Sequence, residues 1–156
     1  MIELWSLGKE DKKELSAGIE VYKQRLKHYT KFELHTVDNS KLSKLNNKEQ
    51  ILQLEADLIL SKLRERDLLV TLDEKGRTYS SIEFAEKLNQ WMVRSPSKII
   101  FLIGGSFGIS EKLHARADTK LSISSFTFPH QLVRLIFTEQ LYRAFTILKN
   151  EKYHHE

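Results

Sequence analysis

The chain has 156 residues, of which 40% are hydrophobic, and this suits one domain with an ordinary core. We take residues 1–156 as a single domain, because two prolines and six glycines leave no linker, repeat or low-complexity tract. The lack of cysteine excludes disulfides, thiolate nucleophiles and cysteine-ligated zinc. No apolar run approaches the roughly 20 residues of a membrane helix, and no signal peptide is evident, so a cytoplasmic protein is expected.

The formal net charge of +4 is modest. In the run from Lys9 to Glu14, basic and acidic residues are mixed, which is more typical of a solvated helix face than of a surface for a polyanion. The charge therefore permits an RNA partner without indicating one.

Hydrophobic spacing alternates between the period of a strand and that of a helix. Strands are predicted over residues 2–7, 32–36, 67–72, 98–103 and 121–123. Helices are predicted to begin near residues 15, 48, 80, 110 and 129. Polar stretches predict loops over residues 38–47 and 73–76. Five strand–helix repeats predict an α/β fold with a mostly parallel sheet and helices on both faces.

The last predicted helix is apolar around most of its circumference, whereas a helix on the outside of a monomer needs one apolar stripe. Its apolar residues are Leu132, Val133, Leu135, Ile136, Phe137, Leu141, Tyr142, Ala144, Phe145, Ile147 and Leu148. A central core helix would explain this pattern. In a chain of this size a homodimer interface is the favoured explanation.

Ligands of open α/β sheets bind outside the carboxyl ends of the strands, so the loops 72–76, 104–108 and 123–128 are candidates. Three glycines in 104–108 allow close backbone approach, and the amides before a helix suit a carboxylate or phosphate. The spacing matches neither the dinucleotide fingerprint nor the P-loop. A simple tight turn explains the glycines equally well.

Residues 123–128 mix hydroxyl groups with aromatic rings, which could contact a purine and line an apolar wall. A buried strand end followed by a polar turn is the alternative. The C-terminal Tyr153 and His154 offer groups that exchange or donate protons, although a frayed tail is the default expectation. The paired His154 and His155 have no third ligand nearby in sequence, so no metal site is predicted.

Several linked motifs resemble the ribosomal RNA large subunit methyltransferase H family, the smallest kind of SPOUT methyltransferase. The resemblance covers the whole chain in length and motif order. It is carried by the segments Leu72-Asp73, 101–108 (FLIGGSFG), 126–134 (FTFPHQLVR), 139–144 (EQLYRA) and Tyr153-His154.

This resemblance implies a homodimer with a trefoil knot in its C-terminal half. It also implies an enzyme that uses S-adenosylmethionine, without a metal, to methylate N3 of a pseudouridine in 23S rRNA on assembled ribosomes. Two alternatives remain open at this point: a tRNA-directed SPOUT methyltransferase, and a non-enzymatic nucleotide-binding module.

The resemblance also implies roles for individual residues. The cofactor-binding positions would be Leu72, Gly104, Ile123, Ser124, Ser125, Phe126, Thr127 and Phe128. The catalytic group would be Arg143, Tyr153 and His154, with His154 or Tyr153 managing the N3 proton and Arg143 stabilising charge or holding phosphate. His155 departs from the Arg or Lys common in the family, and a neutral imidazole would hold phosphate less well.

Overall fold

The computed structural model describes residues 1–8 and 13–154. Most of the charged run from Lys9 to Glu14 therefore lies outside the described residues, and so does His155. The solvated helix face expected for that run and the role of His155 stay predictions.

Five parallel strands form one sheet in the order β2-β1-β4-β3-β5. The strands are β1 (Ile2–Leu7), β2 (Phe32–Val37), β3 (Leu68–Thr78), β4 (Ile99–Ile103) and β5 (Thr119–Ser122). The helices are α1 (Lys13–Leu26), α2 (Lys48–Leu60), α3 (Ser81–Val93), α4 (Glu111–Arg116) and α5 (His130–Leu148), with a 3-10 turn, η1 (Leu42–Lys44). The predicted alternation of strand and helix is confirmed.

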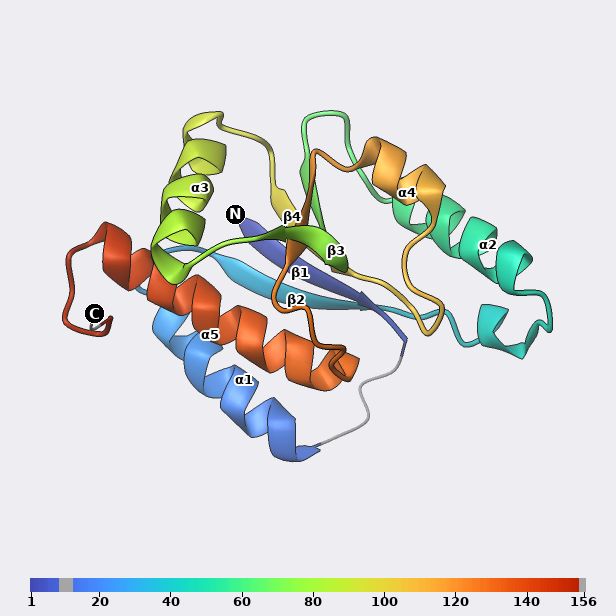
Figure 1. Cartoon of the computed structure of the whole chain (residues 1–156), viewed down its shortest axis with the longest axis horizontal. Coiled ribbons are helices and arrows are strands. Elements are labelled where there is room, and N and C mark those ends of the chain that lie inside the picture. Colours follow the sequence, from blue (N-terminus) through green and yellow to red (C-terminus); the bar gives the residue numbers. More distant parts are fainter. Residues whose placement is uncertain (9–12, 155–156) are drawn as a thin grey trace.

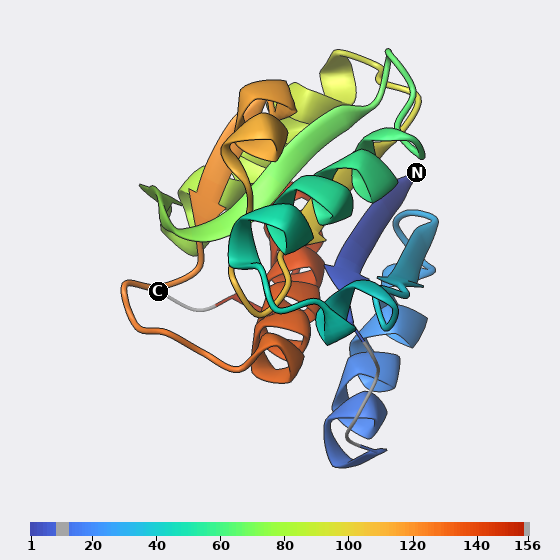
Figure 2. The same cartoon turned by 90° about the vertical axis from the view of Figure 1, so that its right-hand side faces the viewer.

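Helices cover both faces of the sheet, as the α/β prediction requires. On one face α5 lies between α1 and α3, while α2 and α4 lie together on the other (Figures 1 and 2). The central strand β4 serves both layers, because successive side chains of a strand point to opposite faces. Phe101 packs against Phe137 of α5 with ring centroids 4.5 Å apart, while Ile100 and Leu102 belong to the core under α2 and α4.

Local capping fixes where the helices begin. Ser80 and Glu83 form the predicted capping box at α3, with each side chain accepting from the other residue's backbone amide. Ser110 caps α4 by accepting from the amide of Leu113 at 3.3 Å. Pro129 lies one position before the first residue of α5. The loops that precede α3 and α4 are thereby held at their helix ends.

The prediction that the third strand ends at Leu72 and gives way to a loop over 73–76 is wrong. Strand β3 runs on to Thr78, and its register against β5 shifts, so that Leu72 and Arg77 both pair with Leu121. At such an irregularity residues 73–76 leave the regular pairing with β5, which resumes at Arg77. A side chain at Gly76 would place its Cβ 2.7 Å from the backbone of Leu121, so this close approach requires glycine. The predicted loop over 38–47 likewise contains the turn η1.

Two explanations were open for the apolar circumference of α5, a central core helix and a homodimer interface. Its central position between α1 and α3 is that of a core helix. Beyond His130, every residue of α5 is buried or half-buried in the single chain. Several of its apolar side chains remain only half-buried, namely Leu132, Val133, Leu135, Ile136, Tyr142, Ile147 and Leu148. None of the helices in the described part of the chain is long and apolar enough to span a membrane.

Candidate functional site

A cavity of about 540 Å³ lies at the carboxyl ends of β3, β4 and β5. The segments that line it include 72–75, 103–109 and 123–128, with the exception of Ser125. Seven of the eight predicted cofactor positions therefore border one space, and Ser125 does not. The three loops singled out from the sequence meet there, although the first of them is a bulged strand.

The glycine segment folds back on itself at the mouth of this cavity. The amide of Gly108 donates to the carbonyl oxygen of Gly105 at 3.0 Å, and Gly108 adopts a positive φ of 86°. A Cβ at Gly104 would stand 2.5 Å from the carbonyl oxygen of Gly108. No side chain fits at Gly104 unless the two limbs of the turn separate.

A buried carboxyl group lies directly against the glycine turn. Glu55 of α2 is 3% exposed, and the side-chain amide of Asn39 donates to its Oε1 at 2.6 Å. Burial raises the pKa of Glu55, and the Asn39 bond opposes that shift only in part. A Cβ at Gly105 would lie 2.7 Å from Oε1, so Glu55 and Gly105 fit each other closely. Sequence reasoning missed Glu55, although an acid at helical spacing between Ile51 and Ile59 was a visible signal.

Carboxylates outnumber ammonium groups around the cavity. Its lining carries Asp73, Glu74 and Glu111 against Lys75 and Lys120, together with His114 and His130. An excess of acid favours a cationic ligand and opposes one rich in phosphate.

Side-chain contacts join this charged lining to the neighbouring elements. His114 lies between β3 residues, with Nε2 3.1 Å from Asp73 Oδ2 and Nδ1 3.4 Å from Thr71 Oγ1. The Thr127 hydroxyl donates to Glu74 at 3.0 Å and so ties the 123–128 loop to β3. His114 carried no signal in the sequence that marked it as a lining residue.

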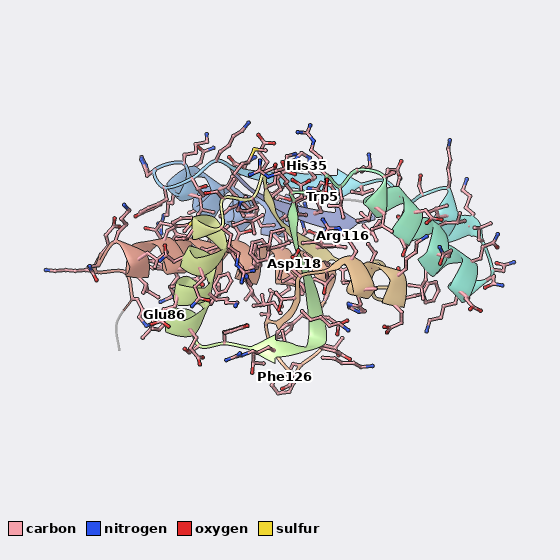
Figure 3. All side chains as sticks on the ribbon, turned by 90° about the horizontal axis from the view of Figure 1, so that it is seen from above. Trp5, His35, Glu86, Arg116, Asp118 and Phe126 are labelled. Atoms are coloured by element: carbon pink, nitrogen blue, oxygen red, sulfur yellow. The ribbon has the colours of Figure 1, made fainter. Side chains whose placement is uncertain are left out.

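The loop from β5 to α5 is shaped by its own hydroxyl groups. Ser122 Oγ donates to the carbonyl of Ser124 at 3.0 Å, and Ser124 Oγ accepts from the amide of Phe126 at 3.0 Å. The loop extends away from the sheet before it enters α5 (Figure 2). The Phe126 ring projects from the molecule and is 77% exposed (Figure 3).

The three predicted catalytic residues lie together at the other end of α5, around Glu139. Glu139 Oε1 accepts from Arg143 Nε at 3.0 Å, from Arg143 Nη2 at 2.6 Å and from the Tyr153 hydroxyl at 3.1 Å. Arg143 Nη1 lies 3.3 Å from His154 Nδ1. We call Glu139, Arg143, Tyr153 and His154 the tail cluster. A frayed tail is excluded for Tyr153 and His154, which are half-buried and bonded.

The tail cluster fixes the hydrogen-bonding roles of its members. Arginine only donates, so His154 Nδ1 accepts from Arg143 and a neutral imidazole then carries its proton on Nε2. Burial raises the pKa of Tyr153, and its hydrogen bond with Tyr22 and the charge of Glu139 act in the same direction. Tyr153 therefore stays a phenol at neutral pH, and the cluster offers donors rather than a free base.

The cavity and the tail cluster are separated along α5. Val133 lines the cavity, and Arg143 follows ten residues later, about 15 Å along the helix axis at 1.5 Å per residue. The C-terminal segment lies at the far end of α5 from the loop that enters this helix (Figure 1). A single chain does not bring the two groups of predicted site residues together.

Comparison with known proteins identifies the family. The family model described as "Predicted SPOUT methyltransferase" matches residues 1–154. The chain belongs to this family. It is 50% identical to a "Ribosomal RNA large subunit methyltransferase H" from Christiangramia forsetii, over 99% of this chain and 98% of that protein. A protein of the same name from Flavobacterium johnsoniae is 46% identical over 99% of both chains.

A solved structure of a probable methylase family protein from Haemophilus influenzae Rd KW20 shares the fold. Its TM-score is 0.53 at 17% identity, covering 99% of this chain and 70% of the other. Membership of the SPOUT methyltransferases makes this chain a methyltransferase of the class that uses S-adenosylmethionine. The C-terminal trefoil knot stays an expectation from the family.

The fit between Glu55 and Gly105 can be tested by compensation. We expect Gly105→Ala to displace the turn and weaken S-adenosylmethionine binding by roughly 5- to 150-fold, because overpacking costs about 1–3 kcal/mol. Adding Glu55→Ala removes the clashing oxygens and should restore much of the affinity measured by calorimetry. Gly104→Ala is the matched control, since its clash is with Gly108 and Glu55→Ala cannot relieve it. If the affinity losses of Gly105→Ala and Glu55→Ala simply added up in the double variant, the proposed fit between the two residues would be contradicted.

The buried Glu55 also predicts a pH dependence of stability. Its pKa is higher in the folded protein than in the unfolded chain, so the native state binds the extra proton. Stability is therefore lost as pH rises from the unfolded pKa of about 4.3 through the raised folded pKa. Glu55→Gln removes this loss, and urea titrations should show its advantage over the wild type growing across that window. A stability advantage of Glu55→Gln that did not change with pH would show that the pKa of Glu55 is not raised by folding.

Proposed function

We propose that this chain methylates N3 of a pseudouridine in 23S rRNA of assembled ribosomes, with S-adenosylmethionine as methyl donor. The large-subunit rRNA follows the name of relatives that match nearly the whole chain at 50% and 46% identity. The N3 position of a pseudouridine and the assembled ribosome are what the resemblance to this family implies. The structural observation that supports the reaction is the acid-lined cavity around the glycine turn at the carboxyl ends of β3, β4 and β5. A ribosomal substrate supports the expectation that the protein acts in the cytoplasm.

The cavity fits S-adenosylmethionine in size and charge. A volume of about 540 Å³ lies within the usual range for small-ligand sites, roughly 300–1,000 Å³. The excess of carboxylates suits a sulfonium cation, whereas the phosphates of ATP or FMN would face Asp73, Glu74 and Glu111. The backbone at Leu72 and Gly104 and the 123–128 loop would hold the adenosyl part. Bound S-adenosylmethionine supplies an electrophilic methyl group for in-line displacement.

The tail cluster would act on the charge of the target base. N3 of a pseudouridine loses its proton before, or as, it attacks, and with no free base in the tail cluster that proton passes to water. Negative charge develops on the ring as the proton leaves, and it is cancelled when the N3–methyl bond forms and the methyl–sulfur bond of the donor breaks. Arg143 and the Nε2–H of His154 are donors that stabilise such charge. Tyr153, kept protonated, orients the cluster through Glu139 instead of removing the proton. This arrangement favours charge stabilisation over a general-base role for Tyr153.

We infer that the active enzyme is a homodimer in which the tail cluster of one copy meets the cavity of the other. The distance of about 15 Å along α5 argues against a site formed within one chain. The half-buried apolar side chains of α5 provide the kind of surface that a second copy would cover.

The proposed function is tested with tritiated S-adenosylmethionine and three RNA substrates from a strain that lacks this enzyme. We expect label in assembled ribosomes, recovered as N3-methylpseudouridine by mass spectrometry, and little in free 23S rRNA or tRNA. Preferential labelling of tRNA would favour a tRNA-directed SPOUT enzyme. A larger thermal shift with ATP or FMN than with S-adenosylmethionine would favour a nucleotide-binding module.

A shared site is tested by mixing two inactive variants. Gly104→Val disables the cavity, and His154→Ala disables the tail cluster. If each site combines two chains, an isolated heterodimer of these variants keeps one intact site, so it should regain about half the wild-type rate on ribosomes. The two homodimers should stay inactive. An inactive heterodimer would place the cavity and the tail of each site in the same chain.

A further inference from the structure

Exposed aromatic rings gather at the mouth of the cavity. Five large apolar side chains are exposed in the described part of the chain, and two of them, Phe107 and Phe126, line this one cavity. Phe107 belongs to the tightly folded 104–108 turn, and its side chain is 47% exposed. Exposed apolar surface beside a ligand site commonly marks a place where a partner binds.

A lysine accompanies the Phe107 ring. Lys48, the first residue of α2, places Nζ 5.9 Å from the ring centroid, within reach of a cation–π contact. Lys41 and Lys44, just before α2, are exposed as well, and Glu49 is the exposed acid next to Lys48. Basic residues thus predominate over this short stretch, whereas the cavity lining carries three carboxylates against two lysines.

The pairing of an exposed ring with a neighbouring ammonium group matches the chemistry of unpaired RNA. Aromatic rings stack on bases of any sequence, while nearby cations neutralise phosphates. A second protein chain covering the same ring would have to desolvate Lys48, which is costly without a carboxylate partner. The charge therefore favours nucleic acid over a second copy of this chain as the occupant.

We propose that Phe107 and Lys48 form a contact with the substrate RNA next to the methylated nucleotide. The Phe107 ring stacks on an unpaired neighbouring base, and Lys48 binds the adjoining phosphate. This proposal rests on the proposed function for its partner, and it gives an RNA-binding role to one side chain of the 104–108 loop and to one side chain of α2.

The stacking contact is tested by steady-state kinetics on ribosomes. Phe107→Ala should raise KM for ribosomes by roughly 5- to 150-fold, the range typical of a lost base stack, and Phe107→Tyr should restore it. Because Phe107 also borders the cofactor cavity, KM for ribosomes is measured at saturating S-adenosylmethionine, and the S-adenosylmethionine Kd is measured separately by calorimetry. Val93→Ala, which trims another exposed apolar side chain at the end of α3, is the control. A wild-type KM for ribosomes in Phe107→Ala at saturating S-adenosylmethionine, with the loss confined to the S-adenosylmethionine Kd, would overturn the proposal.

The phosphate contact is tested by salt dependence. Each phosphate neutralised on a single strand contributes about −0.7 to the slope of log affinity against log salt, so Lys48→Ala should flatten that slope by about this amount. Lys87→Ala is the matched control, because Lys87 Nζ lies 5.8 Å from the Trp91 ring on α3. An unchanged slope, or a weakened dimer by light scattering, would overturn the RNA contact, the latter in favour of a second copy.

The proposed function and the RNA contact of Phe107 and Lys48 would be overturned by different results. If wild-type protein does not methylate ribosomes, the proposed function is wrong and the contact falls with it. If the wild type methylates ribosomes while Phe107→Ala keeps the wild-type KM, the contact alone is overturned.

Discussion

The candidate site depends on one close approach of backbone to backbone. Where β4 ends, the chain turns so tightly that a Cβ at Gly104 would stand 2.5 Å from the carbonyl oxygen of Gly108. The buried carboxylate of Glu55 fills the space beneath, and Asn39 holds that carboxylate in place. Burying a carboxyl group without a cation is unfavourable, so the sheet, α2 and the segment before it must together stabilise this turn. Gly104, Gly105 and Gly108 therefore line the cavity with backbone alone.

The rest of the architecture presents this turn to a ligand and places the reactive side chains elsewhere. Strand β4 is buried on both faces and anchors the turn at the centre of the sheet. Helix α5 begins beside the cavity and ends at the tail cluster. Ligand-holding backbone and charge-stabilising side chains thus occupy opposite ends of one helix, which gives the proposed homodimer a chemical purpose beyond burying apolar surface.

Local sequence signals predicted most of the fold, because local interactions determine those features. The capping box of Ser80 and Glu83 and the cap at Ser110 depend on residues three positions apart. The path of β3 beyond Asp73 could not be predicted in this way, because this part of the strand pairs with Leu121, which is distant in the sequence. Glu55 was missed for the same reason, since its burial depends on Gly105 returning over α2. Glu139 stood within a recognised motif, but its central place became clear only with Arg143 and Tyr153 around it.

The length of α5 carries a consequence for how this protein can vary. An inserted residue would rotate everything beyond it by about 100° and advance it by about 1.5 Å. The tail cluster would then turn as a unit, away from Tyr22 of α1, whose hydroxyl lies 3.4 Å from that of Tyr153, while the loop at the other end stayed in place. The half-buried positions of the helix should thus accept other apolar side chains readily, whereas its residue count between Val133 and Glu139 should be nearly invariant.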